Sequence, residues 1–189
     1  MRVIAGSARG TILQPVPGTS TRPISDRVKE ALFDILGGSI VGACVLDLFA
    51  GTGSVGIEAL SRGAQRAVFV DHNPKAIATI RSNLQRTRLE EAACVVQADV
   101  FAYLKRKPEP FDLIYIAPPQ YLGLWSKALL TLESTSGWLD PQGMVVVQIF
   151  PKEWKALSLT TLSLVDQRQY GSTLLCFYQI YRPVERLTG

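Results

Sequence analysis

Apolar and polar positions alternate in a regular order along most of this chain. From residue 43 onward, short apolar runs alternate with segments in which apolar residues recur every three or four positions. The runs predict buried strands, and the second pattern predicts amphipathic helices. Their alternation is typical of an α/β fold with a mostly parallel sheet covered by helices on both faces. The predicted strands are 43–48, 67–71, 93–97, 111–117 and 143–149, and the predicted helices begin near Ser54, Asn73, Asp99 and Leu122.

The pattern changes after Pro151. Two further strand-like runs lie at about 160–166 and 172–181. Residues 167–171 between them are too few for a crossover helix, so we expect an antiparallel pair at the edge of the sheet.

The segment before the glycine pair at 37–38 has its own character. Residues 2–5 and 11–14 predict two short strands around a turn, and a Pro/Gly/Thr-rich loop follows. Ser25 or Asp26 can then cap a helix that ends at the glycine pair. Its predicted buried face consists of Val28, Ala31, Leu32 and Ile35. We therefore expect an N-terminal extension over 1–38 and an α/β domain over 39–189.

Composition limits the class of protein. The 189 residues are 47% hydrophobic and 19% charged, as in a globular domain. No apolar run approaches the ~20 residues of a membrane span, and the first residues lack the apolar stretch of a secretory signal, so we expect a cytoplasmic protein. Three scattered cysteines, Cys44, Cys94 and Cys176, lie in apolar runs and predict reduced core residues. With His72 as the single histidine, no metal site is expected.

Positive charge is concentrated at the start of the chain. The net charge is +4, and residues 1–30 carry five basic residues against two acidic ones, a net +3. Such a segment suits a polyanionic partner such as RNA or DNA, because phosphate contacts release condensed counterions. A solvated basic face is the alternative.

A predicted buried strand leads directly into a glycine turn, in the sequence VLDLFAGTGS at 45–54. Glycine lets the backbone approach a ligand closely. Gly51, Gly53 and Gly56 match G-x-G-x-x-G, so a nicotinamide dinucleotide site is one interpretation. Asp47 argues against it, because a carboxylate suits an ammonium group and repels a pyrophosphate.

Two more acids follow the next two predicted strands. Asp71 is placed to accept the hydroxyls of a ribose, and Asp99 is placed to accept from an adenine amine. Because ligands bind at the carboxyl ends of strands in an open α/β sheet, these acids and Asp47 predict one pocket. The alternative is that Asp71 and Asp99 only cap helices.

The fourth predicted strand ends in the sequence IYIAPPQY at 114–121. Two consecutive prolines remove backbone donors and leave carbonyl oxygens as fixed acceptors. Such acceptors can hold an amino group for attack, and Tyr121 could stack on a flat base. A structural turn is the alternative.

With these motifs the sequence resembles the class I S-adenosylmethionine-dependent methyltransferases, and among them the RsmD-type enzymes that methylate guanine N2 in small-subunit ribosomal RNA. The resemblance covers nearly the whole chain. It rests on RVIAG at 2–6, Arg9-Gly10, TRP at 21–23 with DRVKEALF at 26–33, DLFAGTG at 47–53 and Pro118-Pro119.

The resemblance implies a Rossmann-like fold and S-adenosylmethionine as cofactor. It implies that Asp47, Gly51, Thr52 and Gly53 frame its methionine half, Asp71 and His72 hold its ribose, and Asp99 and Val100 hold its adenine. Ribosomal RNA, within a small-subunit particle, is the implied partner, gripped by Arg2, Arg9, Arg22 and Arg27. The implied catalytic turn consists of Pro118, Pro119, Gln120 and Tyr121.

The turn departs from the family pattern, which reads Asp-Pro-Pro followed by Tyr or Phe. Here Ala117 stands in the acid position and Gln120 in the aromatic one, so Tyr121 comes one residue late. An active enzyme remains our expectation, because orientation supplies most of the acceleration. The alternatives are methylation of another planar amine, in DNA adenine or protein glutamine, a nicotinamide-dependent oxidoreductase, and a non-catalytic RNA-binding protein.

Overall fold

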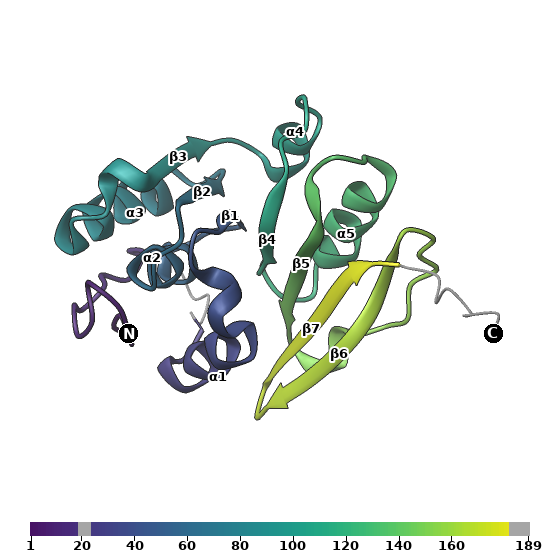
Figure 1. Cartoon of the computed structure of the whole chain (residues 1–189), viewed down its shortest axis with the longest axis horizontal. Coiled ribbons are helices and arrows are strands. Elements are labelled where there is room, and N and C mark those ends of the chain that lie inside the picture. Colours follow the sequence, from purple (N-terminus) through teal and green to yellow (C-terminus); the bar gives the residue numbers. More distant parts are fainter. Residues whose placement is uncertain (19–23, 182–189) are drawn as a thin grey trace, which may run out of the picture.

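The computed structural model describes residues 1–18 and 24–181. Within them, the centre is a seven-stranded sheet of order β3-β2-β1-β4-β5-β7-β6 (Figure 1). Strands β3, β2, β1, β4 and β5 pair in parallel, and β7 pairs antiparallel with both β5 and β6. The strands are β1 (Cys44–Leu48), β2 (Arg66–Asp71), β3 (Ala93–Gln97), β4 (Phe111–Ile116), β5 (Leu139–Ile149), β6 (Leu162–Tyr170) and β7 (Thr173–Ile180).

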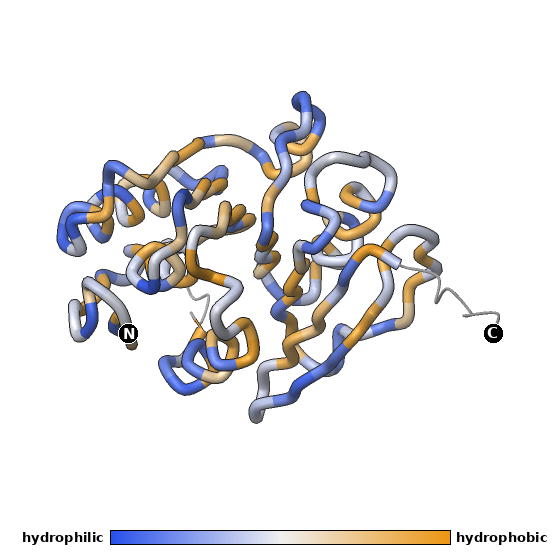
Figure 2. Tube along the Cα trace, in the orientation of Figure 1, coloured by the Kyte–Doolittle hydropathy of each residue, from blue (hydrophilic) through white to orange (hydrophobic). Residues whose placement is uncertain are grey.

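Helices cover both faces of the sheet, and each face has its own apolar cluster. On one face lie α1 (Asp26–Leu36), α2 (Ser54–Ser61) and α3 (Pro74–Thr87), and on the other lie α4 (Val100–Leu104) and α5 (Leu124–Ser134). Short 3-10 turns, η1 (Gly37–Ile40), η2 (Glu90–Ala92) and η3 (Pro151–Glu153), join the elements. Hydrophobic residues line the strands, while hydrophilic residues gather on loops and outer helix turns (Figure 2).

The predicted α/β architecture is confirmed, with differences in detail. The five parallel strands, the antiparallel terminal pair and the N-cap of α3 at Asn73 are as predicted. Residues 167–170 belong to β6 rather than to a loop, so Gly171 and Ser172 alone connect β6 to β7. Gly171 has a φ of +58°, which lets the chain reverse in two residues. β5 begins at Leu139, four residues before its predicted start.

The predicted buried face of α1 is partly wrong. Val28 and Leu32 are buried as expected, but Ile35 is 40% exposed and Ala31 is only half-buried. Lys29 and Phe33 take their place. Lys29 is fully buried because an ion pair with Glu58 compensates its charge, which hydrophobic periodicity cannot reveal. Ser25 caps the helix by accepting from Val28 N.

The N-terminal segment lies against α2. Its two predicted strands reduce to one antiparallel bridge between Arg2 and Ile12. Glu58 of α2 accepts hydrogen bonds from Ile4 N at 2.8 Å and Ala5 N at 3.0 Å. The carboxylate of Glu58 thus satisfies two backbone N–H groups that would otherwise pair with a neighbouring strand.

The cysteine prediction is wrong for Cys94, which is exposed, and Cys44 is only half-buried; Cys176 is buried. Both exceptions lie in outer or terminal strand positions. No helix of the described residues is both long and apolar enough to cross a membrane, and their side chains include no cluster suited to a metal ion.

Candidate active site

A cavity of about 340 Å³ opens where β1, β2 and β4 end. Asp47 of β1 and Tyr115 of β4 are register partners, so both side chains face the same side of the sheet and line this cavity. Its other polar walls come from the glycine turn and from the end of β2, and Phe49, Val55 and Ile24 supply apolar surface. A volume of this size suits a small organic ligand or cofactor. We call it the cofactor cavity.

Asp47 is the buried carboxyl group of the cofactor cavity. It is 2% exposed, and its Oδ2 accepts from Gly56 N at 3.1 Å. Burial raises the pKa of Asp47 to about 8, against the hydrogen bond from Gly56 and with a further contribution from Asp71. Its other oxygen has no protein donor among the described residues. A cation that enters the cavity would stabilise the carboxylate, so Asp47 suits an ammonium group.

The glycines of the turn have separate roles. Gly51 has a φ of +55°, and a Cβ there would meet nothing closer than the Phe49 oxygen at 3.9 Å. Gly51 therefore leaves its backbone open to a ligand. A Cβ on Gly53 or Gly56 would instead press on the Phe69 ring, at 3.3 and 2.3 Å. Gly56 therefore lets α2 pack on Phe69 of β2, and Gly53 also lies against Ile80 of α3. Neither of these glycines lines the cavity, whereas Gly51 and Thr52 do.

Asp71 connects the end of β2 to the glycine turn. Its Oδ2 accepts from Gly51 N at 2.9 Å, and its Oδ1 accepts from Asn73 N at 2.8 Å. It does not cap α3, because Asn73 does so through Lys75 N. Asp71 and the largely exposed His72 both line the cavity, where each oxygen of Asp71 keeps a lone pair for a ligand hydroxyl.

Asp99 and Val100 lie outside the cofactor cavity. Asp99 is exposed and caps α4, since its Oδ1 accepts from Ala102 N at 2.9 Å, and Val100 is buried in the apolar cluster under α4. The contact observed for Asp99 is therefore the one expected if this residue caps a helix. The assignment of this pair to an adenine stays a prediction.

A second, more polar cavity of about 860 Å³ adjoins the first, and we call it the substrate groove. Its walls come from the start of α1, the turn after β4 and the β6–β7 connection, and include Pro118, Pro119 and Gln120. Ala117, Pro119 and Gln148 line both cavities. A group bound in the substrate groove can therefore reach a group bound in the cofactor cavity.

Tyr121, the expected stacking residue, lies outside both cavities and is 64% exposed. It has a φ of +62°, its backbone N–H donates to Glu153, and its ring lies 5.8 Å from that of Phe150. With Gln120 in the aromatic position of the family pattern, the aromatic side chain that follows it lies outside the groove.

Sequence reasoning missed Tyr115 and Gln148, which line the cavities from β4 and β5. The Tyr115 hydroxyl donates a short hydrogen bond to Gln148 Oε1. A signal was present, because Gln148 is the single polar residue in the apolar run at 144–150.

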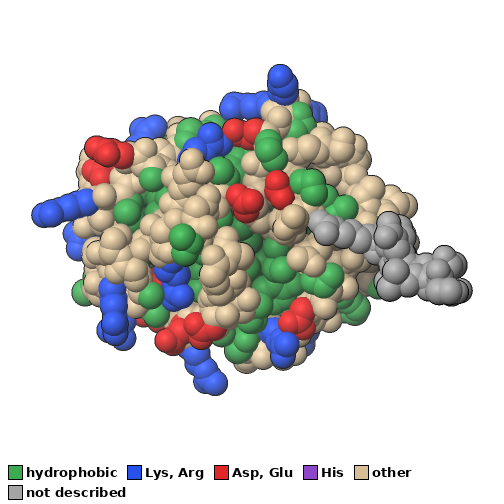
Figure 3. Space-filling view, viewed as in Figure 1, with side chains coloured by type: hydrophobic (Ala, Val, Ile, Leu, Met, Phe, Trp, Pro, Cys, Tyr) green, Lys and Arg blue, Asp and Glu red, His purple; other side chains and the backbone are tan. Residues whose placement is uncertain are grey.

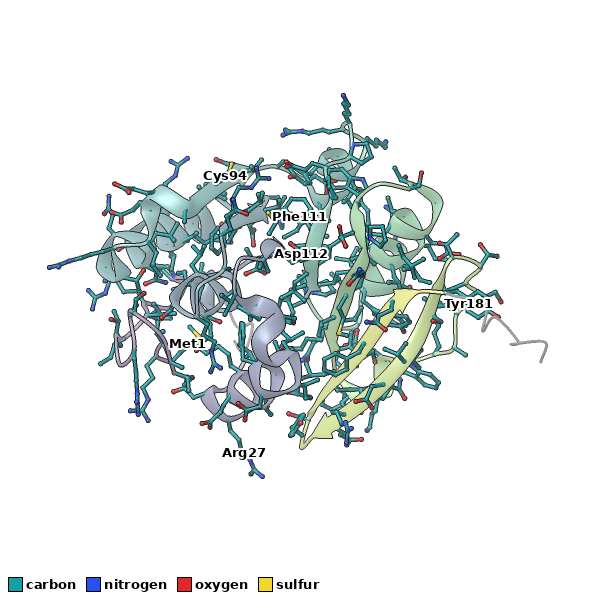
Figure 4. All side chains as sticks on the ribbon, viewed as in Figure 1. Met1, Arg27, Cys94, Phe111, Asp112 and Tyr181 are labelled. Carbon is teal, nitrogen blue, oxygen red and sulfur yellow. The ribbon has the colours of Figure 1, made fainter. Side chains whose placement is uncertain are left out.

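The basic residues of the N-terminal segment are dispersed. Arg2 and Arg9 are both exposed, and Arg2 forms an ion pair with Asp26 in which Nε and Oδ2 are 3.6 Å apart. Arg27 lines the substrate groove and projects from α1 into solvent (Figure 4). Arg22 lies outside the described residues. Lys and Arg side chains are spread around the rim of the face seen in Figure 3 rather than gathered in one patch.

Residues 1–179 match the family described as "Conserved hypothetical protein 95". The chain is 39% identical over 182 residues to the Bacillus subtilis "Putative rRNA methyltransferase YlbH", covering 95% of this chain and 98% of the relative. It is 34% identical over 180 residues to "Ribosomal RNA small subunit methyltransferase D" of Haemophilus influenzae, covering 90% and 93%. The solved structure of the Escherichia coli "Putative methyltransferase yhhF" has a TM-score of 0.83 at 33% identity, covering 95% of this chain and 97% of that one.

These matches, together with Asp47 in the cofactor cavity, set aside the nicotinamide-dependent oxidoreductase. The chain belongs to the Conserved hypothetical protein 95 family, that of the RsmD-type enzymes, and is an S-adenosylmethionine-dependent class I methyltransferase.

Proposed function

We propose that this protein methylates the exocyclic N2 of a guanine in small-subunit ribosomal RNA, acting in the cytoplasm on a small-subunit particle. The observation that carries the proposal is the shared wall of the two cavities at Ala117, Pro119 and Gln148. Relatives named for small-subunit rRNA methylation, at 34% and 36% identity, support the choice of substrate.

The residues of the cofactor cavity fit S-adenosylmethionine. Asp47 would pair with its ammonium group, Gly51 and Thr52 would follow its methionine part with Gly53 shaping the turn, and Asp71 with His72 would hold its ribose. Asp99 and Val100 would meet the adenine at the outer end of β3. When bound, the cofactor supplies a methyl group on a positively charged sulfur.

The turn after β4 would hold the target amine in line with that methyl group. Pro118 and Pro119 lack N–H donors, so the backbone there offers carbonyl oxygens to the amine hydrogens, with Gln120 and Tyr121 bordering the turn. The new N–C bond forms as the methyl leaves sulfur, and the amine then loses a proton to solvent. Without a carboxylate at Ala117, the loss of one charge-assisted hydrogen bond costs about 1.5–3 kcal/mol, or roughly 10- to 150-fold in rate.

Positive side chains would position the RNA by contacting its phosphates. Arg27 lies at the mouth of the substrate groove, and Arg2, Arg9 and Arg22 lie in the same N-terminal segment. A guanine in folded RNA has to be unstacked to enter the groove, at a cost of a few kcal/mol. Binding that weakens steeply with salt is the expected sign of these contacts.

The test is transfer of labelled methyl from S-adenosylmethionine to unmodified small ribosomal subunits, followed by digestion to nucleosides. Label in N2-methylguanosine is the expected result, and large subunits, naked rRNA, DNA and protein are the comparison substrates. Label in adenine or glutamine would replace the proposed substrate by another planar amine. If only the Ala117→Asp variant transferred methyl, the natural protein would be a non-catalytic RNA-binding protein.

A further inference from the structure

Gln148 is a polar side chain that lines both the cofactor cavity and the substrate groove. It lies near the end of β5, two residues after Val146, the register partner of Tyr115, so it faces the same side of the sheet as the floor of the cofactor cavity. Asp47, Tyr115 and Gln148 thus form a polar row across β1, β4 and β5. A polar side chain in the otherwise apolar second half of β5, residues 144–149, indicates a role beyond packing.

Tyr115 fixes the orientation of the Gln148 amide. The Tyr115 side chain is buried, and its hydroxyl donates to Gln148 Oε1. Burial, with the nearby Asp47, raises the pKa of Tyr115 well above its usual value, so the hydroxyl keeps its proton and remains a donor. The amide oxygen therefore points toward Tyr115, and one of its two lone pairs is used.

The other polar sites of this amide have no protein partner. An amide oxygen has a second lone pair, and Gln148 Nε2 donates to no acceptor among the described residues. In the neighbouring turn, Ala117 presents a methyl group and Pro118 and Pro119 present rings, while the polar Gln120 lines the substrate groove but not the wall shared by the two cavities. One free acceptor and one free donor therefore lie side by side at the shared wall.

We propose that Gln148, oriented by Tyr115, binds the edge of the target base that carries the amine, with Oε1 accepting an amine N–H and Nε2 donating to the adjacent ring nitrogen. In guanine this edge consists of N2 and N3. Gln148 then supplies the side-chain acceptor that Ala117 lacks, and Tyr115 is a positioning residue. The inference rests on the proposed function and adds the residue that recognises the reacting edge.

The experiment measures single-turnover methyl transfer to small subunits at saturating S-adenosylmethionine, alongside the cofactor Kd by calorimetry and the Tm. Gln148→Met keeps the length of the side chain and removes both polar contacts. We expect its rate to fall about 10-fold or more, with the cofactor Kd within twofold of wild type. Gln148→Glu keeps acceptor oxygens and should lie closer to wild type than to Gln148→Met.

Two further variants separate recognition from packing. Gln167→Met is the matched control, because Gln167 lies on β6 outside both cavities and its Nε2 donates to Cys176 Sγ. Its rate should stay within about twofold of wild type. Tyr115→Phe should slow the wild-type enzyme by about 3- to 10-fold but have little further effect in the Gln148→Met background.

The results also distinguish this inference from the proposed function. Equal rates for wild type and Gln148→Met, or independent effects of Tyr115→Phe and Gln148→Met, would overturn the role of Gln148 and leave the proposed function standing. If wild type labels an amine other than guanine N2, the proposed function fails, and the same variants compared on that amine decide the role of Gln148. A wild type that labels no substrate would overturn both.

Discussion

Replacement of Asp47 by asparagine tests the electrostatics of the cofactor cavity. The change keeps the size of the side chain and an oxygen that can accept from Gly56 N, but it removes the charge that faces the cavity. Truncating one partner of a buried charge pair costs about 2–5 kcal/mol. With a pKa of about 8, wild-type Asp47 must first lose its proton at pH 7, which costs about 1.4 kcal/mol. The expected net loss at pH 7 is about 0.6–3.6 kcal/mol, or roughly 3- to 400-fold weaker binding of S-adenosylmethionine.

The pH dependence gives a sharper signature than the affinity alone. Because burial raises the pKa of Asp47, the free protein carries a proton there at pH 6–7.5, and the ion pair with an ammonium requires its release. Wild-type affinity should therefore increase with pH over this range, by at most about tenfold per unit. The range stops below the pKa of the ligand's own amino group, about 7.7–8.0 in model compounds. The same linkage makes the Asp47 contribution to folding fully present below pH 3.8 and lost as pH rises toward 8.

Calorimetric titration at several pH values, in buffers of different ionisation enthalpy, measures both the affinity and the proton released. Asp112→Asn is the matched control, because Asp112 accepts from Cys44 N near the start of β4, at the opposite end of the strand from the cavity. Its affinity should match that of wild type. If Asp47→Asn binds within twofold of wild type, or keeps the pH slope and the proton release, Asp47 does not pair with the ammonium group.

Three further changes test the rest of the fold. Glu58→Leu leaves the buried Lys29 ammonium unpaired and removes the acceptor of Ile4 N and Ala5 N, so it should lower the free energy of unfolding by about 3–5 kcal/mol in denaturant titration. Adding Lys29→Met removes the unpaired charge and should restore part of this loss. A double variant as unstable as Glu58→Leu would contradict this ion-pair account. Gly6→Ala places a Cβ 1.7 Å from the backbone oxygen of Ser61 at a φ of +83° and should lower the Tm measurably. Gly10→Ala has open space at a similar φ, so its Tm should fall by less. Equal decreases in Tm would show that the structure relieves the clash at Gly6. Burial alone would raise the pKa of Glu133, but hydrogen bonds from Thr160 and Thr161 lower it to about 2. In acid titration, the extra stability of wild type over Glu133→Gln should therefore be present above pH 4.5 and be lost as the pH falls toward 2. A stability difference that stays constant with pH would refute this.

The sheet was predictable because its signal is local. The parallel strands contain short apolar runs, and β1 to β4 each lead into an α-helix, two of which begin at a side-chain cap, Asn73 or Asp99. Such patterns can be recognised in a single sequence without tertiary information. The acids Asp47 and Asp71 were predictable for the same reason, since the carboxyl ends of successive strands meet at one edge of the sheet.

Other features depend on contacts between distant parts of the chain. Lys29 is buried because Glu58, 29 residues later, compensates its charge. The sequence around Lys29 does not reveal this partner, so it predicts a solvent-exposed lysine at that position of the helix. Gln148 reaches the site because β5 lies next to β4, which no spacing within the sequence reveals. Tyr121 lies outside the site because Gln120 directly follows Pro119 and Tyr121 adopts a φ of +62° with an exposed side chain, which spacing along the sequence cannot show.

The N-terminal segment contributes residues to the walls of both cavities. Pro15, Val16 and Ile24 line the cofactor cavity, while Ser25 and Arg27 line the substrate groove within a few residues of them. Glu58 and Ser61 of α2 hold the start of this segment through backbone hydrogen bonds, and α2 begins at the glycine turn. Described residues on either side of positions 19–23 therefore line one cavity, and Ser25 and Arg27 line the other. RNA that contacts Ser25 or Arg27 in the substrate groove would also hold the adjacent Ile24, which lines the cofactor cavity, so we expect the two ligands to bind with positive coupling.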